Sequence, residues 1–282
     1  MEVEIKIEGS TNLVKVPVYV NDQGPFTFNL DTGASRTTLS SNLAESLGIQ
    51  TYESSRNDAR GIGGSVTTRF ANIDSLAVGS LSFDGDEVYV LDLNSMLGEC
   101  GARDGVLGHS TLQHCILSLS YHKRRFKLRR GNSSKEESEL EFTWSPFDYI
   151  EDTHLVQIPV YVNHQGPFDF VIDTGAGSSV ITPELAKVLS LQTQPVNGIA
   201  RGIGGDVKLE FATLDHFSFG SYKQERMQVA VIDLGSVSPR GKLIEHGIIG
   251  YDILRQLELV IDYPRKRIAF NLEHSASPSQ NT

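Results

Sequence analysis

Two aspartates that could share acid–base chemistry occur in nearly the same local sequence. Asp31 lies in "FNLDTGAS" (28–35) and Asp173 in "FVIDTGAG" (170–177), and each follows an apolar run typical of a buried strand. A carboxylate in such a place must be hydrogen-bonded, paired or shifted in pKa. Two carboxylates in close contact cannot both ionise, so the pair holds one proton over a wide pH range. One can then take a proton from water while the other serves a carbonyl oxygen, which is chemistry suited to amide hydrolysis.

The duplication extends from these aspartates to almost the whole chain. Residues 16–34 align with 158–176 at an offset of 142, and 14 of the 19 positions are identical. The polar, charged stretch that begins at Asn132 has the composition of a linker. We therefore predict an N-terminal lobe at 1–131, a linker at 132–138 and a C-terminal lobe at 139–282. Further matching pairs of segments are 60–70 with 201–211, 90–93 with 231–234, and 104–128 with 246–270.

Most segments of each half have the pattern of strands. Val14, Val16, Val18 and Val20 alternate with polar or small residues, as a half-buried strand requires. The segments "NDQGPF" and "NHQGPF" carry the Asn, Gly and Pro of a turn. Four segments near the ends of the halves are candidates for a sheet between the lobes: 2–7, 125–128, 139–144 and 267–272.

Short helices are expected at matching places in the two halves. Ser40 is a suitable N-cap for "SNLAESL", and Gly48 suits its end. In the second half, Thr182 is a suitable N-cap and Pro183 suits the first helical position. A further helical turn is expected after Gly108 and after Gly250. The predicted fold class is therefore all-β with little helix.

Three motifs, in the same order in both halves, resemble those of the retroviral-type, or retropepsin-like, aspartic peptidases. They are Asp-Thr-Gly after an apolar strand, a glycine-rich "GIGG" hairpin, and an apolar-apolar-Gly segment, "VLG" at 106–108 and "IIG" at 248–250. The resemblance covers nearly the whole of each half. It implies two retropepsin-like β-barrel lobes related by a pseudo-two-fold axis and fused in one chain, as in the pepsins. A monomer would then carry both halves of the site.

The resemblance assigns roles around the two aspartates. Asp31 and Asp173 would form the catalytic dyad, whose apparent pKa values belong to the pair rather than to either residue. Thr32 and Thr174 would reach across to the backbone of the opposite loop, and ordinary β-branched strand packing is the alternative. The glycines of the two motifs, Gly33 and Gly175, permit a tight turn and let backbone amides approach the carboxylates closely.

The segments "ARGIGG" at 59–64 and 200–205 resemble flaps. A glycine-rich hairpin can open and close over a bound peptide and present backbone N–H groups to it. A nucleotide-binding loop is a poorer interpretation, because the GxGxxG spacing and a βαβ unit are absent. Since both halves keep the motif, we expect a nearly symmetric site. The expected substrate-binding residues are Gly61, Ile62, Gly63 and Gly64 in one flap and Gly202, Ile203, Gly204 and Gly205 in the other.

The chain departs from the family pattern beside the dyad. Retroviral enzymes carry an Arg after the apolar-apolar-Gly segment, and it pairs with an Asp just after Asp-Thr-Gly. Here His109 and Tyr251 stand at the Arg positions, facing Ser35 and Gly177. The loops must therefore be supported in another way. Ser110 and Asp252 could supply local hydrogen bonds, and helix capping is an equally good interpretation of both residues.

A second departure concerns the acidity of the dyad. Many pepsins carry a hydroxyl that donates to a catalytic carboxylate at the positions of Ala34 and Ala176. Without that donor, the dyad should be less acidic and should resemble that of the retroviral enzymes.

Composition argues against several other classes of protein. The chain has 282 residues and a formal charge of -10, which disfavours nucleic-acid binding. No apolar run approaches membrane-spanning length. The two cysteines imply no disulfide framework, and Cys115 is interpreted as a small buried hydrophobe, with a Cys100–Cys115 bond as the alternative. No two of the eight histidines have ligand spacing, so we expect neither a metal nor another cofactor.

The first residues, "MEVEIKIEGS", contain neither the basic region nor the apolar region of a signal peptide. A cytoplasmic location is expected for the sequence as given, and a periplasmic or secreted one if a leader has been removed.

The leading functional hypothesis is a monomeric aspartic endopeptidase. An extended peptide or protein substrate would lie between the dyad and the flaps and be cut at apolar residues. The first alternative is a peptide-binding protein that kept the fold but lost turnover, which the presence of both complete Asp-Thr-Gly motifs disfavours. A glycosidase that uses Asp31 and Asp173 is the second alternative. A symmetric duplication suits it poorly, because its acid and its nucleophile need unlike environments.

Overall fold

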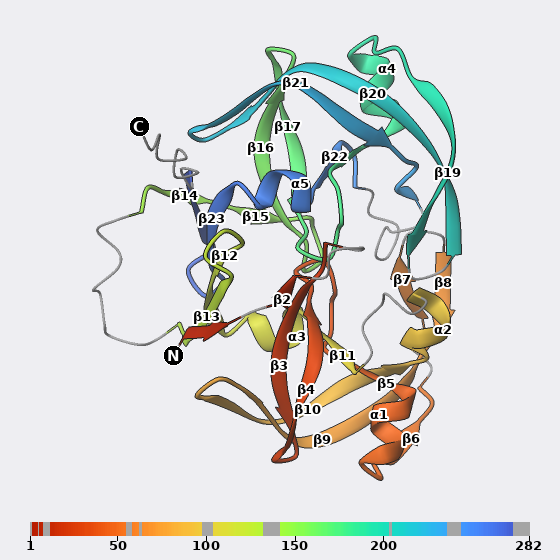
Figure 1. The fold of residues 1–282 in the computed structure, drawn as a ribbon, viewed down its shortest axis with the longest axis vertical. Coiled ribbons are helices and arrows are strands. Elements are labelled where there is room, and N and C mark those ends of the chain that lie inside the picture. The colour runs from red at the N-terminus through yellow and green to blue at the C-terminus, as the bar shows by residue number, and fades with distance from the viewer. Residues whose placement is uncertain are drawn as a thin grey trace, which may run out of the picture.

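The computed structural model of the chain describes residues 2–4, 6–7, 12–54, 58–61, 64–97, 104–131, 142–202, 205–235 and 244–272. Its strands and short helices form two lobes, drawn one below the other in Figure 1. Several predictions fall on residues outside these ranges: the flap positions Ile62, Gly63, Ile203 and Gly204, the linker at 132–138, and Cys100.

The first lobe is a barrel that includes the valine-rich strand. In β3 (Val14–Val20), the four alternating valines are all buried, because successive side chains of a strand point to opposite faces. The strand order is β2-β3-β4-β11-β5-β10-β9-β6, and β3 also pairs with β9, which closes six strands into a ring. The other strands of this sheet are β2 (Lys6–Ile7), β4 (Gln23–Leu30), β5 (Thr38–Ser40), β6 (Thr51–Tyr52), β9 (Arg69–Val78), β10 (Leu81–Leu91) and β11 (Gly105–Leu107).

The second lobe repeats this topology. Its order is β15-β16-β17-β22-β18-β21-β20-β19, and a pairing of β16 with β20 closes the equivalent ring. The predicted all-β class with two barrel lobes is therefore confirmed. The strands are β15 (Asp148–Tyr149), β16 (Val156–Val162), β17 (Gln165–Ile172), β18 (Val180–Ile181), β19 (Gln194–Gly202), β20 (Gly205–Phe219), β21 (Tyr222–Val231) and β22 (Gly247–Ile249).

The short helices lie at the predicted places. Ser40 caps α1 (Ser41–Ser46) by accepting from the N–H of Leu43, and Thr182 caps α4 (Pro183–Val188) by accepting from that of Leu185. Helical turns also follow the two glycines of the apolar-apolar-Gly segments, as α3 (His109–Leu112) and α5 (Tyr251–Leu254). One helix, α2 (Leu93–Leu97), was not predicted. None of the helices in the described ranges is long and apolar enough to cross a membrane.

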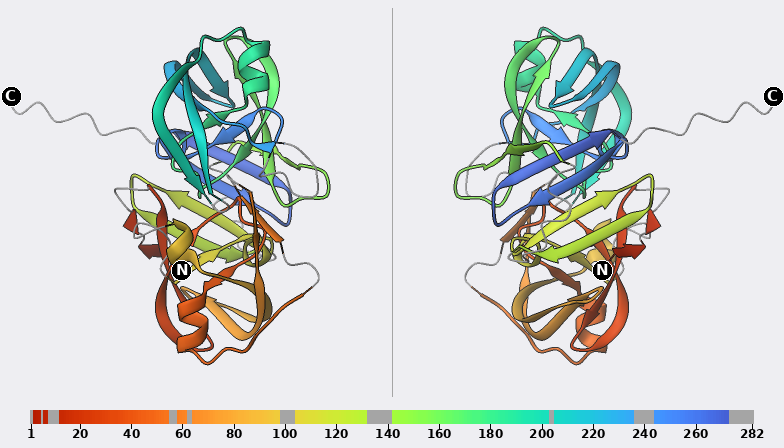
Figure 2. Two further views of the ribbon diagram at one scale, coloured as in Figure 1. Left: turned by 90° about the vertical axis from the view of Figure 1, so that its right-hand side faces the viewer. Right: turned by 90° about the vertical axis from the view of Figure 1, so that its left-hand side faces the viewer.

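A six-stranded sheet joins the two lobes (Figure 2). Its two central strands come one from each half: β12 (Cys115–Ser120) pairs antiparallel with β23 (Leu257–Asp262). Segments 2–4, 125–128 and 267–272 lie in its outer strands, whereas residues 6–7 pair within the first lobe as β2. Of the predicted segment 139–144, residues 139–141 lie outside the described ranges, and among 142–144 only Trp144 belongs to a strand of this sheet. The junction itself was not foreseen. The outer strands are β1 (Glu2–Glu4), β13 (Arg125–Arg130), β24 (Arg267–Leu272) and β14 (Trp144–Pro146).

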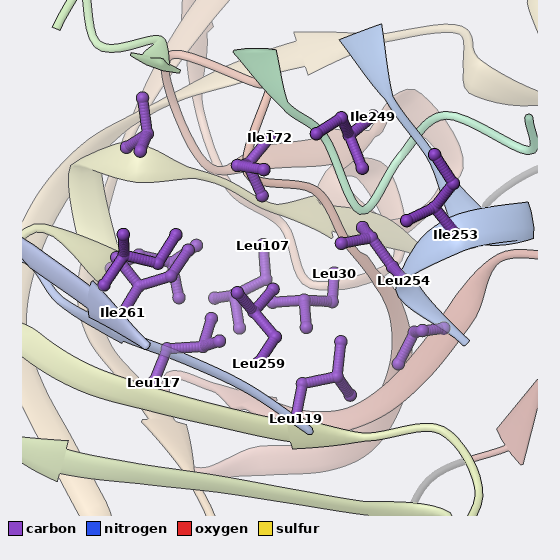
Figure 3. Close-up of a cluster of buried hydrophobic side chains, with 14 of the residues drawn as sticks. Leu30, Leu107, Leu117, Leu119, Ile172, Ile249, Ile253, Leu254, Leu259 and Ile261 are labelled. Atoms are coloured by element: carbon purple, nitrogen blue, oxygen red, sulfur yellow. The ribbon is translucent and has the colours of Figure 1, made fainter. Parts of the chain in front are cut away.

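The hydrophobic core is continuous from one lobe to the other. Figure 3 shows side chains from both halves in one cluster, including Leu30 and Ile172, which immediately precede the two aspartates. Leu117 of β12 and Leu259 of β23 belong to the same cluster, and all four residues are fully buried. Cys115 is a free thiol in the same core, as expected of a small buried hydrophobe. The strands that carry the aspartates are therefore anchored in a shared core.

Candidate active site

The two aspartates are delivered to the lobe boundary by equivalent strands. β4 and β17 end one residue before Asp31 and Asp173, and each lies between an antiparallel neighbour and a short parallel one. The backbone N–H of Asp31 donates to the carbonyl of Leu107 at 3.1 Å, and that of Asp173 donates to the carbonyl of Ile249 at 3.1 Å. The apolar-apolar-Gly segments, β11 and β22, therefore fix the point at which each aspartate leaves its strand.

The two loops approach so closely that only glycine fits between them. The Asp31 carboxylate accepts from the N–H of Gly33 and of Ala34, both at 2.9 Å, and the Asp173 carboxylate accepts from the N–H of Gly175 at 2.8 Å. A Cβ on Gly33 would lie 2.8 Å from Cγ of Asp173, and one on Gly175 would lie 2.5 Å from Cγ of Asp31. Each carboxyl therefore lies against the backbone of the opposite loop, and the structure brings the two acids together.

Two buried threonines tie the loops together by reciprocal hydrogen bonds. The hydroxyl of Thr32 donates to the carbonyl of Ile172, and the hydroxyl of Thr174 donates to that of Leu30, both at 2.9 Å. Each hydroxyl also accepts from the backbone N–H of the other threonine at 3.1 Å. This exchange crosses the lobe boundary four times, so ordinary strand packing is not an adequate description of either threonine.

Burial and proximity make the two carboxyls weak acids. Desolvation, followed by the neighbouring charge of Asp173, raises the pKa of Asp31 to about 8, although the N–H groups of Gly33 and Ala34 favour its ionised form. Desolvation also raises the pKa of Asp173. Both residues keep partial solvent exposure, as a group that meets a substrate requires. The pair therefore holds a proton at a pH where an isolated aspartate would be ionised.

Local hydrogen bonds replace the missing ion pair beside each loop. In the first half, Ser110 Oγ accepts from the backbone N–H of Thr37 at 3.1 Å. In the second half, Asp252 Oδ1 accepts from the N–H and from the hydroxyl of Ser179, at 2.7 and 2.6 Å. The helices α3 and α5 have glycine at the N-cap, without a side-chain cap. Both side chains therefore support their loops locally, and Asp252 Oδ1 also accepts from the N–H of Ile253 in the first turn of α5 at 3.1 Å.

His109 stands where the retroviral-type enzymes carry an arginine, and it enters an aromatic cluster instead of an ion pair. Its ring lies 5.6 Å from the rings of Tyr149, His154 and Tyr263. Desolvation lowers the pKa of His109 to about 4. Behind the other loop the equivalent residue, Tyr251, packs against Tyr121 with ring centroids 5.4 Å apart. The surroundings of the two aspartates therefore differ.

The two predicted flaps are also unlike each other, in contrast to the expected near symmetry. In the first half, Gly61 and Gly64 face each other in a separate two-stranded sheet, β7 (Asp58–Gly61) and β8 (Gly64–Thr67). In the second half, Gly202 and Gly205 end a longer hairpin of β19 and β20 that continues into the lobe sheet. In the first half, β8 ends just before Thr68, a buried polar residue that lies outside the strands. The second half has the apolar Leu209 there, and β20 runs on without a break.

Apolar walls flank the site on both sides. On the first side, Ala34 and Val66 of β8 pack with Met96 of α2 against a buried cluster of the first lobe. On the second side, Ala176 and Val207 of β20 pack against a larger cluster of the second lobe. The unpredicted helix α2 also lies against β19, so the first lobe contacts the hairpin of the second. Within the described ranges, no group of three or more His, Cys, Asp or Glu could hold a metal ion.

Comparison of the sequence with known families agrees with this geometry. Residues 16–111 and 158–253 each match the family described as Aspartyl protease, and together these segments make up more than half of the chain. This chain belongs to the aspartyl protease family. The predicted resemblance and internal repeat are therefore confirmed. A search of curated proteins finds no match.

Solved structures show the same fold as this aspartyl protease family member. The aspartic proteinase from Irpex lacteus aligns with a TM-score of 0.54 and 15% identity over 100% of this chain and 99% of its own. Basic 7S globulin from soybean aligns with a TM-score of 0.52 and 11% identity over 96% of each chain. At these identities the comparison is one of fold, and both alignments span the two lobes.

The sequence indicated no role for two residues that touch the loops, Asn12 and His154. They occupy equivalent positions in the two halves, since 12 plus 142 is 154. His154 contacts the carbonyl of Gly33, and Asn12 that of Gly177. Because one side chain is an amide and the other an imidazole, the two positions do not look equivalent in the sequence. The offset of 142 between the halves is the signal that could have identified them.

Proposed function

We propose that the protein is an aspartic endopeptidase in which Asp31 and Asp173 activate a water for attack on a peptide bond. The observation that carries the proposal is the mutual approach of the two carboxyls, each of which lies against the backbone of the opposite loop. Their raised pKa values keep one proton in the pair. A base and an acid are then present in one site.

The ionised member takes a proton from the water as the water oxygen attacks the carbonyl carbon. The protonated member hydrogen-bonds the carbonyl oxygen, on which negative charge develops. When the tetrahedral intermediate breaks down, a carboxyl protonates the leaving nitrogen, the C–N bond breaks and one proton remains with the pair. The protons belong to the coupled pair, so either aspartate can hold the one that remains.

The substrate in this proposal is a peptide in extended conformation. Strands in the flaps can hydrogen-bond an extended backbone, and the walls beside Ala34 and Ala176 can receive apolar side chains. Since the two halves of the site lie on one chain, the active species is a monomer. The alternative is a peptide-binding protein with little or no turnover on the same fold.

Substitution of one aspartate tests the proposal. Asp31→Asn or Asp173→Asn should each abolish hydrolysis of a quenched peptide library, because a single carboxyl lacks its acid–base partner. The fold should survive. The raised pKa means that the folded dyad binds more protons than the unfolded chain, so the dyad costs stability as pH rises from 3.8 through about 8.

The asparagine variants should therefore unfold no more easily than the wild type at neutral pH, as measured by thermal denaturation. Near wild-type turnover in either variant would contradict the shared dyad. A wild type that binds a statine-type peptide but hydrolyses no member of the library would favour the peptide-binding alternative.

A further inference from the structure

His154 reaches from the second lobe to the Asp31 loop of the first. Its Nε2 lies 2.7 Å from the carbonyl oxygen of Gly33. A carbonyl can only accept, so Nε2 carries the hydrogen and donates. The side chain comes from a tight turn before β16. There the Thr153 hydroxyl donates to the carbonyl of Ile150 at 2.7 Å and accepts from the N–H of Leu155 at 3.1 Å. Leu155 is buried, so the turn is anchored in its own lobe.

The carbonyl that His154 contacts belongs to the peptide group that supports the dyad. The C=O of Gly33 and the N–H of Ala34 form one planar peptide unit. That N–H donates to Asp31 Oδ1 at 2.9 Å. Hydrogen bonds therefore run in series from His154, through this peptide, to Asp31. A donor at the oxygen of a peptide fixes its plane and strengthens the hydrogen bond that its N–H makes.

The other half of the site makes a weaker contact at a different place. Asn12, the equivalent of His154, donates from Nδ2 to the carbonyl of Gly177 at 3.4 Å, a long distance for a hydrogen bond. That carbonyl belongs to a different peptide from the one between Gly175 and Ala176. The two carboxyls thus differ in the support that their loops receive across the lobe boundary.

We infer that His154 is a positioning residue, which orients the Gly33–Ala34 peptide toward Asp31 and couples the docking of the lobes to the geometry of the dyad. This inference rests on the proposed endopeptidase function for its kinetic consequence, but its structural part does not depend on it. It also gives a role to His109, because the ring of His109 packs beside that of His154.

The surroundings keep this imidazole neutral. Desolvation lowers the pKa of His154, although its hydrogen bond to Gly33 opposes that effect. The titratable groups in the cluster are His109, Tyr149 and Tyr263, with the charged Lys266 over the ring of Tyr149 and His114 acting on His109 at longer range. Burial is therefore the cause that favours the neutral form of His154.

A pair of variants matched in size isolates the donor. His154→Gln keeps an N–H at about the reach of Nε2, whereas His154→Met has a similar length and no donor. We expect His154→Met to lower kcat about tenfold or more with little change in KM, because small misplacements of a reacting group cost up to about 10²-fold. His154→Gln should restore most of the loss. Asn12→Ala is the control at the equivalent position and should stay near wild type.

Amide hydrogen exchange of the segment 28–37 is measured in the same folded variants. It should be faster in His154→Met than in His154→Gln, and this result holds whether or not the protein cleaves peptides. If the wild type shows no turnover while exchange follows the donor, the function fails and the positioning role stands. Equal kcat and equal exchange in the Gln and Met variants would overturn the inference, as would an equal loss in Asn12→Ala.

Discussion

At the scale of single residues, the same Asp-Thr-Gly motif is used twice but is supported differently. The reciprocal bonds of Thr32 and Thr174 are symmetric to 0.1 Å. The residues behind the loops are not, since His109 and His154 stand on one side and Tyr251 and Asn12 on the other. The matching threonine bonds hold the two aspartates in equivalent places, so the pair can share a proton. The residues behind the two loops differ, so the two aspartates can differ in their properties.

The raised pKa values predict how the proposed activity should depend on pH. With the pKa of Asp31 raised to about 8 by burial and by its neighbour, the singly protonated pair persists to near-neutral pH. Ala34 offers no hydroxyl to stabilise the doubly ionised form. We expect a pH profile of kcat/KM centred well above the strongly acidic range.

Ala34→Ser should move the alkaline limb of that profile toward lower pH, because a donor to the ionised pair lowers its apparent pKa. The measurement is the profile of both proteins on one peptide that has an apolar cleavage site. A wild-type optimum confined to strongly acidic pH, or a limb that moves upward in the variant, would refute the argument.

At the scale of elements, short strands and turns place the site. β11 and β22 are only three residues long, yet each pairs in parallel with a strand that carries an aspartate. The two glycine-rich segments show that a repeated motif does not ensure a repeated element. Gly61 and Gly64 end a short separate hairpin, whereas Gly202 and Gly205 end a long one that continues into the sheet of its lobe.

The junction of β12 with β23 should carry much of the stability that the lobes share. Leu259 is fully buried opposite Leu119 across the lobe boundary (Figure 3). Leu259→Ala should lower the free energy of unfolding by about 2–5 kcal/mol. Because the core is continuous, denaturant unfolding should remain one transition with an earlier midpoint. Val188→Ala, on an exposed side chain, should change stability by less than about 0.5 kcal/mol. Two separate transitions, with only one of them shifted, would show that the lobes unfold independently.

At the scale of the whole molecule, the chain joins two equivalent lobes around one site. The central strands of the shared sheet come from both halves, and the four threonine bonds cross the same boundary. Each lobe alone contributes one aspartate, so neither is a complete site. The lobe boundaries at 1–131 and 139–282 stay a prediction.

Activity per molecule should therefore be independent of protein concentration. A site formed by two separate subunits loses activity on dilution, whereas one formed within a chain does not. Specific activity measured over a hundredfold dilution, together with sedimentation velocity, tests this. Loss of activity on dilution alongside a dimer in sedimentation would contradict it.

The sequence alone determined the features that depend on local pattern and on repetition. The alternating valines indicated a strand, Ser40 and Thr182 indicated helix starts, and two Asp-Thr-Gly motifs at matching positions indicated a shared pair of carboxyls. These inferences need no knowledge of distant contacts, because strand alternation and capping depend on neighbouring residues and the internal alignment depends on repeated ones.

Only the tertiary structure decided which distant residues meet. The pairing of β12 with β23 and the contact of His154 with Gly33 join residues from separate parts of the chain. The short separate hairpin of β7 and β8 depends on the packing around it. His154 and Gly33 are 121 positions apart, and no local pattern relates an imidazole to a carbonyl at that separation. Hydrogen bonds and packing depend on distances in space, so the asymmetry of a duplicated chain becomes visible only once its two halves are docked.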